Sequence, residues 1–141
     1  MNTSSALRRH LSLLAVGSLT AAGLTTGLVA APAQAAEVDL AARMHATNAY
    51  PNAHGHAEYE SDNDGREFEI SLAGVRRLAG HRVTVRVHGD IVGRMTVNQY
   101  GRAHLERNSG VPRMTAGNVV RVRTASGKLV SYGTLHRDSE D

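Results

Sequence analysis

Apolar and polar residues alternate along most of the chain after residue 36. Successive side chains of a strand point to opposite sides of a sheet, so this alternation predicts strands with one buried and one exposed face. We expect eight short strands, with inward positions at Val38 to Met44, Ala57 and Tyr59, Phe68 to Leu72, Val83 to Val87, Met95 and Val97, Ala103 and Leu105, Val120 and Val122, and Val130 and Tyr132.

Short segments rich in glycine, asparagine and aspartate separate these strands. Residues 62–65, 108–110 and 116–118 contain types that tolerate positive φ angles or cap their own backbone. Residues 87–92 predict a tight hairpin, and residues 75–78 predict a single helical turn. The pattern therefore predicts an all-β fold, an antiparallel β-sandwich or small barrel of about seven to eight strands.

The first 35 residues have the pattern of an export signal. A polar start ends in Arg8 and Arg9, residues 11–31 are apolar and uncharged, and Ala33-Gln34-Ala35 forms a small-x-small cleavage site. We expect a signal peptide at residues 1–35 and a secreted, extracellular protein that begins at Ala36. An uncleaved membrane anchor is the alternative. The many Gly, Ser, Thr and Ala residues in the apolar stretch disfavour it.

The chain has no cysteine, so neither a lipid anchor nor a disulfide is expected. The pair Arg8-Arg9 resembles a twin-arginine signal with loosely matching flanks, and general secretion is the default expectation. Removing 35 of the 141 residues leaves 106, enough for one domain. We expect a β-sandwich domain at residues 36–137 and an acidic tail at residues 138–141, with no membrane association after cleavage.

Charge in the expected mature chain is nearly balanced but unevenly distributed. It keeps 14 of the 16 basic residues and all 13 acidic ones, which gives no reason to expect nucleic-acid binding. Residues 36–69 contain eight acidic and two basic residues, whereas residues 70–137 contain two acidic and twelve basic ones. We favour the interpretation that opposite charges lie on adjacent strands. A basic ligand-binding face is the alternative.

If the protein has a basic ligand-binding face, its candidate contact surface is a polar stripe of six arginines: Arg82, Arg86, Arg94, Arg102, Arg121 and Arg123. A guanidinium group can donate two parallel hydrogen bonds to a carboxylate or a phosphate. The candidate partners are therefore a cell-wall polymer or another extracellular protein.

Several short motifs follow one another through the expected domain: Gly55-His56-Ala57-Glu58-Tyr59, Arg66-Glu67-Phe68-Glu69-Ile70, Val85-Arg86-Val87-His88-Gly89, Gly117-Asn118-Val119-Val120-Arg121-Val122 and Ser131-Tyr132-Gly133-Thr134-Leu135. In these motifs the chain resembles small secreted proteins of Streptomyces-like actinobacteria. Each consists of a signal peptide and one β-rich domain of uncharacterised function. The resemblance implies an extracellular or cell-envelope β-sandwich and brings no catalytic residues.

Histidines suggest a second kind of chemistry. His54 and His56 are two residues apart, so in a strand they emerge on one face and can share a zinc or copper ion with a third ligand. His45, His88 and His104 fall on the polar faces of their expected strands. No ligand set has the spacing of a known metal motif, and we favour solvated surface histidines.

Calcium binding and catalysis have weaker support. Placing Gly65 at the sixth position of an EF-hand loop puts Ser71 where a bidentate Glu is required, so we favour an ordinary turn. No serine lies in a Gly-x-Ser-x-Gly elbow, and acidic pairs such as Glu58 and Glu60 fit a solvated strand face. We therefore expect no enzyme activity and no cofactor. The predicted function is a secreted or envelope binding or structural protein, with a metal-binding protein or metal-dependent enzyme as the alternative.

Overall fold

The computed structural model describes residues 36–137, so the expected signal peptide (1–35) and acidic tail (138–141) lie outside the described residues. Within this range the chain forms nine strands and one 3-10 turn. They are β1 (Val38–Ala46), β2 (His54–Ser61), β3 (Arg66–Ala73), η1 (Arg76–Leu78), β4 (Arg82–Val87), β5 (Asp90–Thr96), β6 (Ala103–Arg107), β7 (Val119–Thr124), β8 (Leu129–Thr134) and β9 (His136–Arg137). The predicted all-β, antiparallel class is confirmed.

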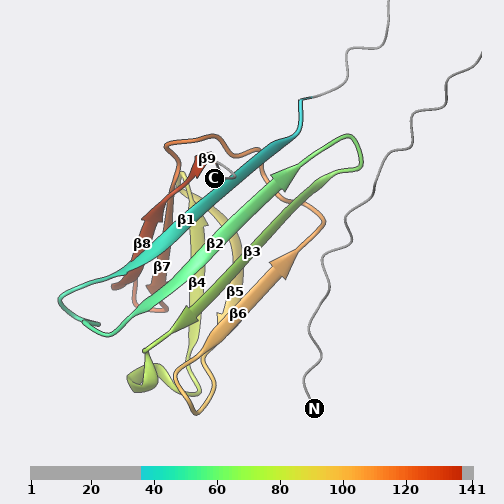
Figure 1. The fold of residues 1–141 in the computed structure, drawn as a ribbon. Helices are drawn as coiled ribbons and strands as arrows, with labels where there is room; N and C mark the ends of the chain where they lie inside the picture. Colours follow the sequence, from blue (N-terminus) through green and yellow to red (C-terminus); the bar gives the residue numbers. More distant parts are fainter. Residues whose placement is uncertain (1–35, 138–141) are drawn as a thin grey trace, which may run out of the picture. The chain divides into compact units, whose positions relative to one another are not determined.

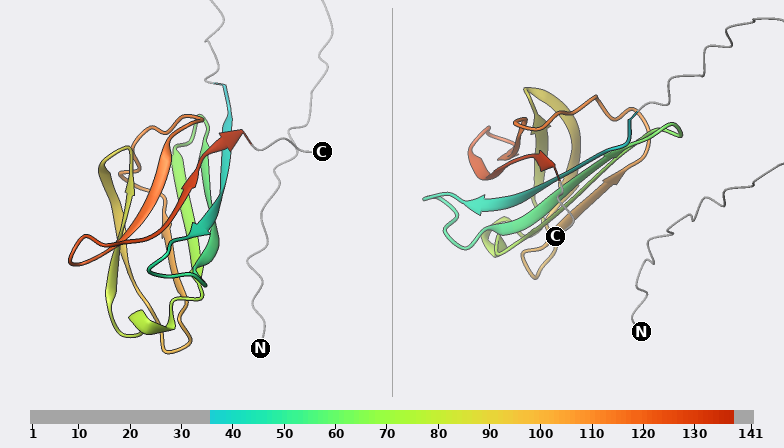
Figure 2. Two further views of the ribbon diagram at one scale, coloured as in Figure 1. Left: turned by 90° about the vertical axis from the view of Figure 1, so that its left-hand side faces the viewer. Right: turned by 45° about the horizontal axis from the view of Figure 1, so that its top comes forward.

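The strands form one sheet in the order β5-β4-β7-β8-β1-β2-β3-β6, which is nearly closed into a barrel. In Figure 1, β1, β2, β3 and β6 form the front layer, and β4, β5, β7 and β8 form the back layer. Strand β1 belongs to both, because its first part pairs with β2 and its end pairs with β8. Figure 2 shows β8 and β9 (red) crossing toward β1.

Alternation places the apolar side chains between the two layers. Phe68 and Ile70 of the front layer and Val85 and Val122 of the back layer are fully buried. All eight predicted strands are present, and the predicted helical turn is η1. The predicted inward position of Tyr132 is wrong: the β7–β8 register shifts at Val122/Arg123, so that Val130 and Ser131 are both buried and Tyr132 faces outward. Strand β9 was not predicted, because a strand of two residues is too short to show alternation.

A tight turn joins β4 to β5, as predicted. His88 and Gly89 have φ angles of 49° and 93°, which is the geometry of a primed two-residue hairpin turn. Farther along, the β4–β5 register shifts at Val85/Arg86. Because of this bulge, Ile91 and Arg94 both face outward although they are three residues apart.

In the described domain the two end strands of the sheet, β5 and β6, meet without a ladder of backbone pairs. Arg107 of β6 instead donates a hydrogen bond from Nη1 to the carbonyl oxygen of Val92 in β5, at 3.0 Å. Gly93 leaves room for the side chain of Leu105, since a Cβ at this glycine would lie 2.6 Å from Leu105 Cδ2. One polar contact and one apolar contact thus close the seam.

Residues 36–137 pack around this core as one compact unit. The chain from Ala36 to Asp141 is therefore the form used in the experiments below. Over residues 36–137, no helix has the length and apolar character needed to cross a membrane.

Candidate binding surfaces

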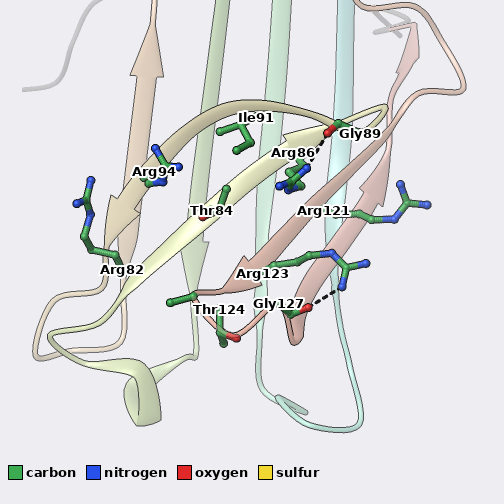
Figure 3. A pocket seen from close by; sticks show the side chains of 11 residues that line it. Arg82, Thr84, Arg86, Gly89, Ile91, Arg94, Arg121, Arg123, Thr124 and Gly127 are labelled. Carbon is green, nitrogen blue, oxygen red and sulfur yellow. Dashed lines mark hydrogen bonds between the residues drawn. The ribbon is translucent and has the colours of Figure 1, made fainter.

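Five arginines gather on the outer side of the back layer, and we call this set the arginine face. Arg82 and Arg86 come from β4, Arg94 from β5, and Arg121 and Arg123 from β7. The valines between them point into the core, so the strand period sends the arginines outward. Figure 3 shows their side chains around Thr84.

Strand register places these side chains in adjacent rows. Arg86 lies directly opposite Arg121, and Thr84 lies between Arg94 and Arg123. All five line one open hollow of about 920 Å³. No aspartate or glutamate is among the described residues that line it. The face therefore concentrates positive charge where an anionic group can approach.

Two of the arginines are tied to the turns at opposite ends of the hollow. Arg86 donates from Nη1 to the carbonyl oxygen of Gly89 at 2.8 Å, and Arg123 donates from Nη1 to that of Gly127 at 2.7 Å (Figure 3). A guanidinium has five N–H donors, so most of each group stays available. The two tethers hold the groups in place before any ligand arrives.

Exposed apolar side chains flank the central pair of arginines. Ile91 lies opposite Arg86 in the register, and Tyr132 lies opposite Arg121. They are 45% and 42% exposed, which makes them two of the three large apolar side chains that are exposed in the described domain. The Tyr132 ring is 5.9 Å from the ring of His45. The row formed by Ile91, Arg86, Arg121 and Tyr132 thus offers apolar and aromatic surface next to its positive charge.

Six carboxylates occupy the outer side of the front layer, and we call this set the acidic face: Asp39, Glu58, Glu60, Glu67, Glu69 and Glu106. One row runs from Asp39 through Glu60 to Glu67. A second row runs from Glu58 through Glu69 to Glu106. Like charges are direct neighbours across the strands here too.

The expectation that opposite charges lie on adjacent strands is therefore wrong. No described strand pairing places an arginine or lysine directly opposite an aspartate or glutamate. The reason is connectivity. The acid-rich segment folds as consecutive hairpins, β1 to β2 to β3, which keeps its charges in one layer. The one ion pair among residues 36–137 joins His104 Nδ1 to Glu69 Oε1 at 3.7 Å.

Burial and the crowding of carboxylates together raise the pKa of one carboxyl group on the acidic face. Partial burial raises the pKa of the Glu60 carboxyl above its usual value, and the nearby charges of Asp39, Glu67, Glu58 and Asp62 raise it further. The ionised form of Glu60 is thus less stable in the folded domain than in the unfolded chain.

Arg102, the sixth predicted arginine, lies apart from the other five. It immediately precedes β6 and lines a separate hollow of about 470 Å³ together with His54, His56, Ser71 and His104. The candidate stripe is therefore contiguous for five members and does not include Arg102.

The alternatives based on histidine and serine find little support in this second hollow. No group of three or more His, Cys, Asp or Glu side chains in residues 36–137 is arranged to hold a metal ion. The His54 ring contacts the Asn52 carbonyl oxygen through Nδ1 at 2.8 Å. Ser71 Oγ and Glu69 Oε1 both approach the same nitrogen of His104, at 3.2 and 3.7 Å. A Ser-His-acid relay uses both ring nitrogens, so these contacts do not form one.

The turn considered for calcium has a structural explanation. Asp62 Oδ1 accepts hydrogen bonds from the backbone N–H groups of Asp64 and Gly65 at 2.8 and 2.9 Å. This is the ordinary role of an aspartate at the start of a turn.

Comparison with known proteins adds no family. No family model matches this chain, and no curated protein matches it. The resemblance to secreted actinobacterial proteins stays a prediction. Five residues that support the arginine face were not predicted from the sequence, namely Thr84, Gly89, Ile91, Gly127 and Tyr132. Their role depends on register and bulges that alternation alone does not reveal.

Proposed function

We propose that this protein is a non-enzymatic, extracellular binding protein whose arginine face binds an anionic polymer, such as an acidic polymer of the cell wall. The observation that carries the proposal is the set of five arginines on three adjacent strands around a hollow with no acidic lining residue in the described domain. The export pattern of residues 1–35 supports the location.

A repeating ligand suits this surface because its charges repeat. Neighbouring strands lie about 4.8 Å apart, and alternate residues of one strand lie about 6.7 Å apart. Arg86 and Arg121 are neighbours across strands, and Arg121 and Arg123 alternate along one strand. Several anionic groups of one polymer can therefore each meet a guanidinium, which donates two hydrogen bonds to a phosphate or carboxylate.

The surroundings of the arginines favour a polymer with less polar parts between its charges. Ile91 and Tyr132 flank the central pair, and Tyr132 offers an exposed ring against which a sugar or a carbon backbone can pack. The tethers of Arg86 and Arg123 reduce the ordering that binding would otherwise require.

Direct binding measurements test the proposal. The Ala36–Asp141 chain is titrated with purified acidic wall polymer, inorganic polyphosphate and polyglutamate at about 10 mM and about 150 mM salt, between which the Debye length falls from about 30 Å to about 8 Å. We expect binding that weakens steeply with salt. Replacing Arg86→Ala and Arg121→Ala together should lower the affinity at least about tenfold, which is the effect expected when two charge-assisted contacts are lost.

A matched variant separates the arginine face from total charge. Arg77 and Arg113 are exposed and lie away from the hollow, so Arg77→Ala with Arg113→Ala removes the same charge elsewhere. This control should change the affinity far less than the Arg86 and Arg121 pair. Equal effects of the two pairs, or binding that is indifferent to salt, would refute the proposal. The comparison of polyphosphate with polyglutamate shows which anionic group is preferred.

A further inference from the structure

We propose that copies of this protein associate with one another, the acidic face of one copy lying on the arginine face of the next. The partner is a second copy of this chain. The association goes beyond polymer binding and does not depend on it. It follows from the way the two faces are charged and placed.

The two faces belong to opposite layers of one domain. The arginine face is the outer side of β4, β5 and β7, the acidic face is the outer side of β1, β2, β3 and β6, and the core lies between the layers (Figure 2). One copy can therefore offer both faces at the same time. A contact between two different surfaces of identical copies joins them head to tail and leaves a free face at each end.

The charged positions of the two faces lie on strand lattices of the same spacing. Both are built on antiparallel strands, so their rows are separated by about 4.8 Å across strands and about 6.7 Å along them. Each acidic row places a carboxylate on three adjacent strands, whereas each arginine row across β5, β4 and β7 places two arginines, with Thr84 or Ile91 at the third position. Carboxylates and guanidinium groups also match in geometry, because each presents two parallel hydrogen-bonding atoms.

Within residues 36–137 the arginine face has no ion pair, and the acidic face has one, between Glu69 and His104. Direct like-charge neighbours such as Arg86 and Arg121, or Glu58 and Glu69, destabilise a sheet. Burial raises the pKa of the Glu60 carboxyl, and the charges of the neighbouring carboxylates raise it further. The single ion pair of the described domain uses a histidine and leaves the five arginines uninvolved. Each face lacks the counter-charges that the other face of a second copy supplies.

Sedimentation velocity tests the association. The Ala36–Asp141 chain is studied over a range of concentrations at about 10 mM salt, where charges act over about 30 Å. We expect the weight-average mass to rise with concentration. Salt at about 150 mM should lower the association constant at least about tenfold, because the Debye length then falls to about 8 Å.

Charge reversal makes the test specific. Arg86→Glu with Arg121→Glu leaves three arginines beside two carboxylates on the arginine face, and Glu58→Lys with Glu67→Lys leaves four carboxylates beside two lysines on the acidic face, so each variant alone should stay largely monomeric. Mixing the two variants should restore association, since each face then meets an opposite one. All four positions lie on the outer surface, and circular dichroism checks that the variants fold. The control Arg77→Glu with Arg113→Glu should associate like the original chain.

The outcomes separate this inference from polymer binding. A chain that stays monomeric at every concentration, or a mixture no larger than its components, overturns the self-association even if polyphosphate still binds. The Glu58→Lys and Glu67→Lys variant keeps its arginine face, so it should bind polyphosphate at least as well as the original chain. An associating chain that does not bind any polymer would instead overturn the proposed function alone.

Discussion

The arginine face and the acidic face are both built on neighbouring antiparallel strands that place like charges opposite each other, but they differ in how those charges are held. Arg86 and Arg123 are tied to turn carbonyls around a hollow, with Ile91 and Tyr132 beside them. In residues 36–137 the carboxylates of the acidic face have a single ion pair, between Glu69 and His104.

This difference indicates which face is organised to receive a ligand. A fixed guanidinium beside apolar surface loses little freedom when an anion binds. Carboxylates on an open strand face keep more of their rotational freedom. The acidic face is thus better suited to a partner whose own charges are already fixed, as those of the arginine face are.

The largest effect that we expect comes from changing how the arginine face donates while keeping its charge. Arg86→Lys with Arg121→Lys preserves two positive charges but removes the planar two-point donors. The polyphosphate affinity should fall roughly tenfold, or about 1.4 kcal/mol. Titration calorimetry measures it, with Arg77→Lys and Arg113→Lys as the matched control. An unchanged affinity would show that the arginine face acts only as a patch of charge.

A smaller effect tests whether both faces carry like-charge repulsion. Glu58→Gln removes one member of the Glu58–Glu69 pair, and Arg121→Gln removes one member of the Arg86–Arg121 pair. Each should raise the free energy of unfolding, by about 0.2 to 1 kcal/mol for a direct cross-strand pair. The gain should be smaller for Arg121, because its half-buried stem also packs on the sheet. Urea unfolding measures both.

A loss of stability in Glu58→Gln would contradict the idea that the acidic face is electrostatically strained. The double variant should show the sum of the two single effects, because the positions lie in different layers and share no partner.

The smallest expected effect is a dependence of stability on pH, and it concerns only the acidic face. Because the folded domain raises the pKa of Glu60, the folded state holds this proton more tightly than the unfolded chain does. Its ionised form therefore destabilises the fold near neutral pH. The cost disappears as pH falls through the raised pKa toward the ordinary value of 4.5.

Glu60→Gln should accordingly stabilise the domain near neutral pH by up to about 0.5 kcal/mol, the usual size of a surface effect. This advantage should shrink toward zero as the solution is acidified. Urea unfolding of both forms over a pH series measures it. An advantage that grows on acidification would show that the pKa of Glu60 is lowered.

Much of the fold could be predicted from the period of the sequence. Alternation such as Val83, Val85 and Val87 located the strands, and the hairpin at residues 87–92 followed from its turn residues. The pairing order could not be predicted, because alternation shows which side of a strand is buried but not which strand lies beside it. The β4–β5 bulge also had no signal, since it depends on packing within the sheet.

Five of the six predicted arginines do form the candidate surface, but their arrangement on it was not predicted. Arg82 and Arg86 alternate on one strand, so their shared face was evident. Arg102 was grouped with them because position in the chain does not show that β6 joins the other layer. Charge neutralisation was expected because the two halves of the chain were assumed to interleave, whereas consecutive hairpins keep local composition together.

The seam between β5 and β6 has a consequence for how copies of this domain can meet. Strands at the end of a sheet are the usual place where another chain adds by backbone pairing, and proteins that fail to protect them aggregate. Here the two end strands lie against each other, with the Arg107 guanidinium on the Val92 carbonyl and Leu105 over Gly93. The nearly closed sheet thus guards its own ends against strand addition and leaves contact between copies to side chains, which salt can reverse.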